Sequence, residues 1–178
     1  MTAASSFAAA LLCAGLLAAG SAHAQQQPPA SPLDKIPDKM PFSTPYGTPI
    51  TLARAQAVVQ AAAEEAAKRG WALNIAVVDP GGNLIAFTRM DGAQIASIAI
   101  SQHKARVAAT YRRPTRVFED AVQKGGMTYL LTLDDIIASR GGIPLVEDGH
   151  LIGAIGCSGG TGSQDEAACT AGAGTVNK

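Results

Sequence analysis

The chain has 178 residues, enough for one domain of ordinary size, and its 14 basic and 14 acidic residues cancel to a formal net charge of zero. This balance excludes a strongly basic nucleic-acid-binding surface and an electrostatic grip on anionic membranes. Apolar residues make up 47% and aromatic residues 4%, which excludes general disorder and an aromatic platform for stacking bases. No apolar run reaches the roughly 18 residues that a membrane-spanning helix needs.

The first 24 residues have the composition of an export signal. They contain no Asp, Glu, Lys or Arg, and an apolar run covers residues 7–19. Ala22 and Ala24 occupy both small positions of an A-x-A cleavage site. No basic residue precedes the run, and a buried alanine-rich helix is the alternative interpretation. We therefore expect residues 1–24 to be removed and the mature protein to be periplasmic or secreted.

A proline-rich segment follows the predicted signal. Residues 25–49 hold seven of the ten prolines and show neither helical nor strand periodicity. We interpret residues 25–45 as an extended linker and residues 46–178 as the folded domain.

The domain is predicted to begin with a helix and a β-hairpin. The helix covers residues 52–69, with Thr51 as its N-cap. Residues 71–79 and 84–89 have the pattern of strands, and the Pro-Gly-Gly-Asn sequence between them is typical of a tight turn.

Two further helices are predicted after this hairpin. A long helix covers residues 93–111 and is ended by Pro114, and Thr115 is the predicted N-cap of a shorter helix that ends at Lys124. The pattern of residues 127–139 is ambiguous between helix and strand.

The last part of the domain is predicted to form a second hairpin and a final helix. Residues 143–146 and 151–157 are the strands, and Ser163 with Glu166 fits a capping box at the start of the helix. Because the strands arrive as adjacent pairs separated by helices, the sequence predicts an α+β fold. We expect an antiparallel sheet built from two hairpins, with helices packed on it.

A glycine-rich turn before the final helix is the first candidate binding element. Gly159, Gly160 and Thr161 could hold an anion through backbone N–H groups at the start of a helix. The alternative is a flexible turn with its cap, and the Gly-Lys-Ser/Thr of a P-loop is missing.

The predicted long helix carries two candidate ligand-binding side chains. His103 could ligate haem iron or orient a ligand, and its alternative role is that of a helix-surface residue. Arg106 lies one turn later, and its planar fork suits a carboxylate. Only His103 and His150 remain after signal removal, and neither has an evident nucleophile partner, so we identify no catalytic set.

Signal removal would also leave two cysteines, Cys157 and Cys169. In an oxidising compartment they could form a disulfide, or they could be two small buried hydrophobic residues. Their spacing, with no histidine nearby, does not match that of zinc ligands. Both interpretations stay open on sequence grounds.

Several motifs occur in order along the domain: Ala-Val-Val-Asp at 76–79 with Gly81-Gly82, Arg-Met-Asp at 89–91, Ser-Gln-His-Lys-Ala-Arg-Val-Ala-Ala at 101–109, Arg-Pro-Thr at 113–115, Gly-Gly-Ile-Pro at 141–144, and Gly-Ala-Ile-Gly-Cys-Ser-Gly at 153–159. This arrangement, over about residues 51–173, resembles the GlcG/HbpS haem-binding family, which is related to the PduO C-terminal domain. The resemblance implies a profilin-like domain that assembles into dimers or larger homo-oligomers. It also implies haem as a cofactor, because some secreted members bind haem.

In the best-known haem binder of this family, a threonine after the long helix is tied to haem coordination, and Thr115 is the matching residue. The first hypothesis is therefore an exported haem-binding protein with His103, Arg106 and Thr115 at the site and His103 as the metal ligand. The alternative is an exported enzyme or accessory protein that binds a small hydroxy- or oxo-acid such as glycolate. In that case Arg106 and the glycine-rich turn would hold the anion, although the sequence shows no acid–base pair.

Overall fold

The computed structural model describes residue 38 and residues 42–177, and the chain divides into two units, residues 1–39 and 40–178. The predicted signal segment 1–24 and most of the predicted linker lie outside the described residues. All described helices and strands belong to the second unit.

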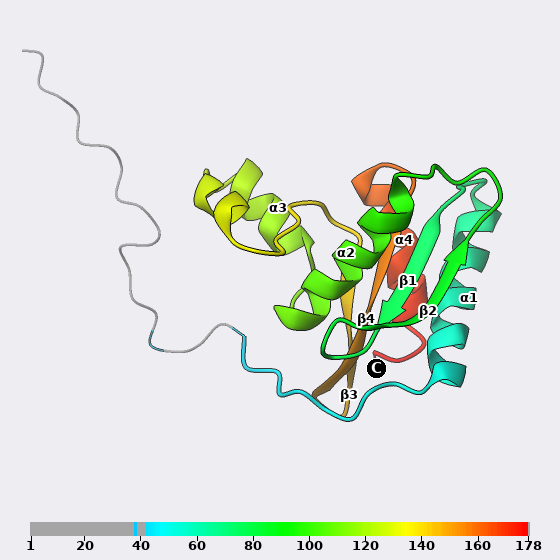
Figure 1. Cartoon of the computed structure of the whole chain (residues 1–178), viewed down its shortest axis with the longest axis horizontal. Coiled ribbons are helices and arrows are strands. Elements are labelled where there is room, and N and C mark those ends of the chain that lie inside the picture. Colours follow the sequence, from blue (N-terminus) through cyan, green and yellow to red (C-terminus); the bar gives the residue numbers. More distant parts are fainter. Residues whose placement is uncertain (1–37, 39–41, 178) are drawn as a thin grey trace, which may run out of the picture. The chain divides into compact units, whose positions relative to one another are not determined.

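A four-stranded antiparallel sheet forms the centre of the second unit (Figure 1). One hairpin pairs β1 (Asn74–Val78) with β2 (Leu84–Arg89), and the other pairs β3 (Gly142–Glu147) with β4 (His150–Ser158). The strand order is β2-β1-β4-β3, so the two hairpins are joined through β1 and β4. The predicted α+β fold, a profilin-like antiparallel sheet made of two hairpins with packed helices, is confirmed.

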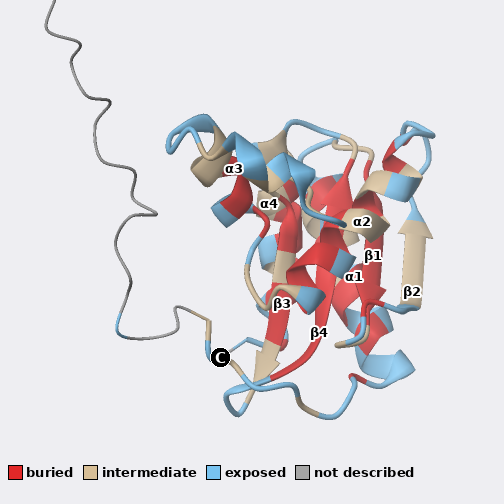
Figure 2. Ribbon diagram, turned by 60° about the vertical axis from the view of Figure 1, so that its left-hand side comes forward, coloured by how far each residue is buried: buried red, intermediate tan, exposed pale blue. Residues whose placement is uncertain are grey.

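Helices cover both faces of this sheet. The helices α1 (Leu52–Lys68) and α4 (Gly162–Ala173) pack on the face that carries Ile75 and Val77 of β1. The helix α2 (Ser97–Thr110) packs on the face that carries Ala76 and Val78. Successive side chains of a strand point to opposite faces of the sheet, and helices cover both faces. Every residue of β1 is therefore buried (Figure 2).

The helix α2 lies very close to the sheet because the residues between them are small. A Cβ atom on Gly156 of β4 would collide with the main chain at Ser101 and Ala105 of α2. The other contacts on this face come largely from alanines, including Ala108 and Ala154. This close packing fixes the rotation of α2 and therefore which of its side chains face outward.

Several predicted segments have different bounds in the structure, and the largest differences are in the first strand, predicted over residues 71–79 and observed as β1 (Asn74–Val78), and in α2. The helix α2 begins at Ser97 rather than at residue 93: Gly92 adopts a left-handed backbone with φ of +78°, and residues 91–92 and 95–96 form turns. The helix α3 (Arg116–Gln123) follows as predicted, and the ambiguous segment forms a 3₁₀-helix, η2 (Thr128–Thr132), followed by turns.

The predicted helix caps agree with the structure in position but not in their hydrogen bonds. Thr51 and Thr115 are the N-cap residues of α1 and α3, as predicted, but neither makes a capping hydrogen bond with its side chain. The capping box of α4 is formed by Thr161 and Gln164. It lies two residues before the predicted pair because both pairs fit the same S/T-x-x-E/Q pattern.

The segment before α1 contacts the end of α2. The guanidinium of Arg113 lies 3.1 Å from the ring centroid of Phe42, and the hydroxyl of Tyr46 donates to the carbonyl of Thr110 at 2.8 Å. A cation over an aromatic face is attracted by the ring quadrupole. Contacts with the domain therefore begin at Phe42, inside the predicted linker. No helix in residues 42–177 is long and apolar enough to cross a membrane.

Candidate functional site

The outer side of α2 and the turn after η2 enclose a groove of about 450 Å³, which is within the size range of small-molecule sites. Isoleucine side chains supply apolar surface, and an imidazole, a guanidinium, an amide and a carboxylate supply polar groups. The lining residues are Ile98, Ala99, Ile100, Gln102, His103, Arg106 and Asp135. Two of the predicted site residues, His103 and Arg106, therefore lie in the same groove.

His103 is held by the turn that faces α2. Its Nε2 lies 3.0 Å from the carbonyl oxygen of Asp135 and 4.0 Å from the carboxylate of the same residue, and 37% of its side chain is exposed. A carbonyl oxygen can only accept a hydrogen bond, so Nε2 carries a proton, and in the neutral form of the ring Nδ1 is then the nitrogen with the lone pair. Within the described residues, no group donates a hydrogen bond to Nδ1.

Arg106 is supported by the β1–β2 turn. A Cβ atom on Gly82 would lie 2.7 Å from Cγ of Arg106, and Gly82 has φ of +83°, which favours glycine. The turn thus makes room for the aliphatic stem of Arg106. No acidic side chain among residues 42–177 forms an ion pair with this guanidinium.

Thr115 does not line the groove. Its side chain is fully buried, its hydroxyl accepts a hydrogen bond from the N–H of Gly142 at 2.9 Å, and its own N–H donates to the Gly142 carbonyl at 3.0 Å. This residue ties the start of α3 to the start of β3. The structure therefore does not bring Thr115 together with His103 and Arg106.

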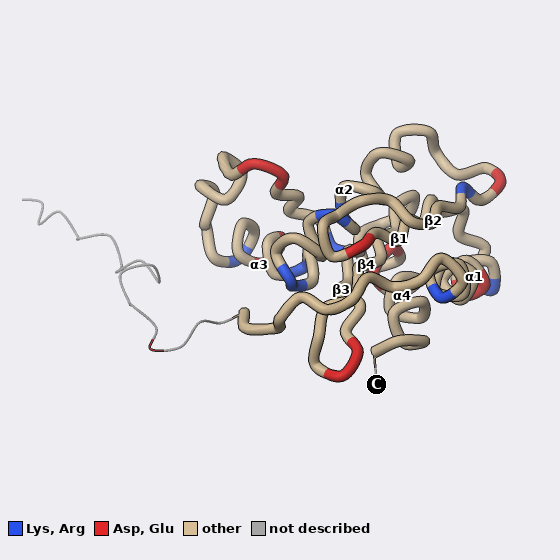
Figure 3. Tube along the Cα trace, turned by 60° about the horizontal axis from the view of Figure 1, so that its bottom comes forward, with Lys and Arg blue, Asp and Glu red and all other residues tan. Residues whose placement is uncertain are grey.

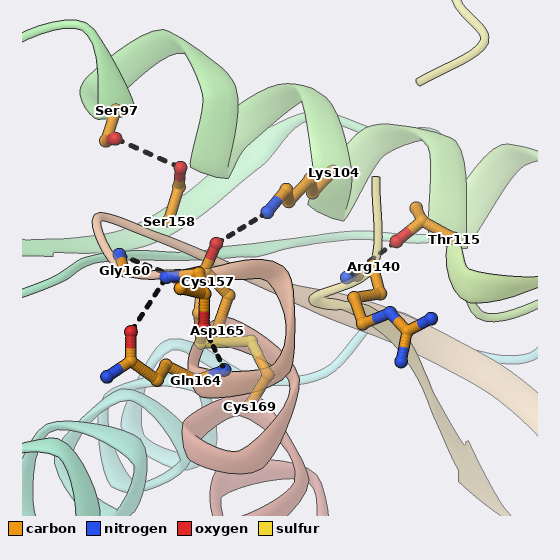
Figure 4. A network of polar contacts seen from close by, with 12 residues as sticks. Ser97, Lys104, Thr115, Arg140, Cys157, Ser158, Gly160, Gln164, Asp165 and Cys169 are labelled. Carbon is orange, nitrogen blue, oxygen red and sulfur yellow. Dashed lines mark hydrogen bonds and ion pairs between the residues drawn. A yellow bond between two sulfur atoms is a disulfide. The ribbon is translucent and has the colours of Figure 1, made fainter. Parts of the chain in front are cut away.

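The glycine-rich turn already holds an anion from its own chain. The N–H of Gly160 donates to the carboxylate of Asp165 at 3.0 Å, and the N–H of Thr161 donates to the side chain of Gln164 at 2.8 Å (Figure 4). Gly159 precedes these residues, with φ of +149°. Of the two interpretations left open by the sequence, the N–H groups of Gly160 and Thr161 fit the turn with its cap, because the following helix supplies their acceptors.

A buried ion pair lies beside this turn. The ammonium of Lys104 is 2.8 Å from the carboxylate of Asp165 (Figure 4). Burial raises the pKa of Asp165, and the nearby Lys104 and Gly160 groups offset only part of that effect. The sequence analysis missed both residues. Helical periodicity was the available signal that both side chains are buried. Lys104 lies three positions after the buried Ser101, and Asp165 lies three positions before the buried Ala168.

Buried polar side chains continue from this ion pair along the inner side of α2. Ser158 donates to the hydroxyl of Ser97 at 3.0 Å, and Gln94 donates to the same hydroxyl at 2.6 Å. Asn74 donates from its side-chain amide to the carbonyl of Gln94 at 3.1 Å. Because Ser97, Ser158 and Asn74 are buried, this network stabilises the contact between α2 and the sheet rather than forming an open site.

Charged residues of both signs are spread over several elements of the domain (Figure 3). A largely buried pair joins Glu119 of α3 to Arg140, which donates to it from Nε and from its backbone N–H, both at 2.7 Å. Burial raises the pKa of Glu119, but the hydrogen bonds from Arg140 outweigh it, so the net pKa is lowered. No group of three or more metal-binding side chains occurs in the part of the chain that the structure describes.

Cys157 of β4 and Cys169 of α4 form a disulfide, and both residues are fully buried (Figure 4). Of the two interpretations left open by the sequence, the structure contains the bonded pair. The bond connects the central sheet to the helix that carries Asp165.

This fold, with a groove on the outer side of α2, is that of an α+β domain of a known family. The family described as "Haem degrading protein HbpS-like" matches residues 50–174, and the chain belongs to this family. The resemblance identified from the motifs is thereby confirmed.

Known relatives agree with this assignment. Over 93 residues the chain is 44% identical to Protein GlcG of Escherichia coli K12, which covers 52% of this chain and 69% of GlcG. The crystal structure of HbpS superposes with a TM-score of 0.68 and 30% identity, covering 74% of this chain and 93% of HbpS. The crystal structure of a PduOC:heme complex superposes with a TM-score of 0.66 and 26% identity, covering 73% and 96% of the two chains.

Proposed function

We propose that this protein binds haem in the groove on the outer side of α2, with His103 as the iron ligand and Arg106 as the partner of a haem propionate. The observation that carries the proposal is that both side chains line one groove beside Ile98 and Ile100. A neutral imidazole nitrogen with a lone pair is a good iron ligand, and a guanidinium suits a carboxylate. The haem complex of a structural relative supports this choice of ligand.

Thr115 is left out of the proposed ligand set. Its hydroxyl is buried and bonded to Gly142, and the residue is not among those that line the groove. The chemistry that haem would supply is the redox and ligand chemistry of its iron, whereas the protein residues would bind and orient it.

The protein acts after export in this proposal. The composition of residues 1–24 supports export, as does a disulfide, which is typical of proteins in oxidising compartments. The intact mass of the native protein tests it, because cleavage after Ala24 leaves Gln25 as the first residue. A native protein that retains Met1 would contradict export.

A hemin titration of the purified protein tests the proposed site. Hemin should give a Soret shift, His103→Ala should change that spectrum and weaken binding, and Arg106→Ala should weaken binding while leaving the shape of the spectrum unchanged. His150→Ala is the matched control, since His150 is also exposed and one of its ring nitrogens also lies near a carbonyl oxygen. In His150 this nitrogen is Nδ1, 2.9 Å from the carbonyl oxygen of Asp148. Identical spectra for the wild type and His103→Ala would contradict the proposal.

A small hydroxy- or oxo-acid in the same groove is the second candidate. It is favoured by one observation, that Arg106 has no acidic partner within the described residues and could hold a carboxylate. The glycine-rich turn would not take part, because the N–H of Gly160 already donates to the carboxylate of Asp165. A thermal shift with glycolate that Arg106→Ala abolishes, together with no Soret shift on adding hemin, would favour this candidate over haem.

A further inference from the structure

Two neighbouring carbonyl groups in the turn after η2 accept hydrogen bonds from side chains at two points along α2. The hydroxyl of Tyr111, directly after the last residue of α2, donates to the carbonyl of Asp134 at 3.0 Å. The next carbonyl, that of Asp135, accepts from Nε2 of His103 at the same distance. The turn is thus bonded to His103 within α2 and to Tyr111 directly after it.

Tyr111 is itself held in place by packing. Its ring meets the ring of Phe118 edge-on, with centroids 5.3 Å apart, and Phe118 is buried. The guanidinium of Arg113 lies within 6 Å of both rings, at 5.9 Å and 5.4 Å from their centroids. The tyrosine hydroxyl is therefore a fixed donor and not a freely rotating surface group.

The backbone of the turn is in a conformation that needs such support. Asp135 has φ of +59°, in the left-handed region that residues other than glycine rarely adopt. A strained conformation persists where surrounding contacts determine it, and Asp135 lies between the bond from Tyr111 to Asp134 and the turn bond from the N–H of Ile136 to the carbonyl of Leu133 at 3.5 Å. Of these two contacts, the bond from Tyr111 is the one made by a side chain.

We propose that Tyr111 is a positioning residue for His103: by fixing the Asp134–Asp135 peptide, it keeps the imidazole bonded through Nε2–H and leaves Nδ1 as the nitrogen that binds a metal. This inference rests on the proposed haem function for the identity of the metal. The hydrogen bond between the ring and the carbonyl, however, is a property of the ligand-free protein. Histidines that bind metals generally donate their other ring N–H to a carbonyl or carboxylate, which fixes the tautomer and the ring orientation.

The experiment compares wild type with Tyr111→Phe, which removes the hydroxyl but keeps the ring against Phe118. Tyr46→Phe is the matched control, because it also removes a tyrosine-to-carbonyl hydrogen bond at the end of α2 but does not touch the turn. Thermal unfolding of all three proteins first establishes that the variants are folded. ¹⁵N NMR of the His103 ring, without ligand and at a pH where the ring is neutral, then reports the protonated nitrogen and the exchange rate of its proton.

Wild type and Tyr46→Phe should show a protonated Nε2 that exchanges slowly, and Tyr111→Phe should exchange several-fold faster. On adding zinc protoporphyrin, the Nδ1 resonance of the wild type should move while Nε2 stays protonated, and hemin affinity should fall several-fold in Tyr111→Phe only. Unchanged exchange in Tyr111→Phe, or a zinc-induced shift at Nε2, would overturn the positioning role even if haem binds. Slow exchange that depends on Tyr111, with no porphyrin binding to the wild type, would overturn the proposed function and the metal role of Nδ1 but leave the positioning of the ring intact.

Discussion

Lys104 of α2 and Asp165 of α4 form an ion pair between helices that pack on opposite faces of the sheet, with side-chain exposures of 2% and 3%. The pair passes beside Gly141, where a Cβ atom would lie 2.8 Å from Cβ of Asp165 and 3.2 Å from Nζ of Lys104. Removing one partner of a buried pair leaves an uncompensated charge, which is the costly change.

We therefore expect Lys104→Met to lower the free energy of unfolding by about 3–5 kcal/mol near neutral pH. The double variant Lys104→Met/Asp165→Asn should lose less than the sum of the two single variants, which urea unfolding would show. Because burial raises the pKa of Asp165, the folded state of Lys104→Met takes up a proton at a higher pH than the unfolded chain does, so its deficit should shrink as the pH falls from neutral toward the ordinary range of a carboxyl group and stay constant below that range. Additive losses in the double variant would contradict the coupling.

Glu119 should make stability depend on pH in the acid range. Its pKa is lowered in the folded protein by the bonds from Arg140, so its contribution is fully present above the unfolded pKa of about 4.3 and is lost as the pH falls through the folded value. Glu119→Gln should be less stable than wild type at pH 7, and the difference should narrow below about pH 4.3. Unfolding midpoints between pH 7 and 3 measure this, with the exposed Glu64→Gln as control, which should follow the wild-type profile.

Thr115 gives a test that separates folding from ligand binding. Thr115→Ala leaves the buried N–H of Gly142 without its acceptor, and we expect a loss of about 1–3 kcal/mol in the free energy of unfolding. Thr115→Ser keeps the hydroxyl and should recover most of it. Hemin affinity, measured well below the unfolding temperature of each variant, should stay at the wild-type value. A loss of affinity in Thr115→Ala that Thr115→Ser restores would return Thr115 to the ligand set.

The disulfide should contribute measurably to stability. Cys157→Ala/Cys169→Ala is expected to lose about 2–4 kcal/mol, since the bond constrains the unfolded chain. A reductant should lower the thermal midpoint of the wild type and leave that of the double variant unchanged. Equal midpoints for the oxidised wild type and the double variant would show that the bond adds nothing.

We propose that copies of the protein associate, as the family resemblance implies. Three apolar side chains in and after η2, Tyr129, Leu131 and Leu133, are exposed in the single chain by 45%, 58% and 44%. Sedimentation at micromolar concentration should show more than one copy in the particle, and Leu131→Asp should shift it toward a single copy. A wild type that sediments only as a single copy would contradict association.

The elements of the fold were predictable because local sequence determines them. The Pro80-Gly81-Gly82-Asn83 turn and the turn before His150 marked both hairpins. The pairing of β1 with β2 and of β3 with β4 followed from these turns. The pairing of β1 with β4 could not be read locally, because it joins segments from the two hairpins. The resemblance of the motifs to a known family was needed to predict that the two hairpins belong to one sheet.

The site was predicted in part for a similar reason. His103 and Arg106 lie three positions apart on one helix, so their shared side followed from helical periodicity. The partners of His103 and Thr115, which are Asp135 and Gly142, come from distant segments and became visible only in three dimensions. The role of the turn at Gly160 stayed open because its anion, Asp165, is a tertiary partner that composition does not reveal.

The pairing of Ile75 with Cys157 has a consequence for how the chain reaches its native state. The central strands meet across about 80 residues of intervening chain, and long-range contacts of this kind slow folding because a large loop must close first. A chain that emerges from the ribosome with its N-terminus first can form the β1–β2 hairpin early, yet the inner edge of β1 stays unpaired until β4 is made. An unpaired strand edge invites aggregation, so a chaperone that protects this edge during synthesis would raise the yield of folded protein.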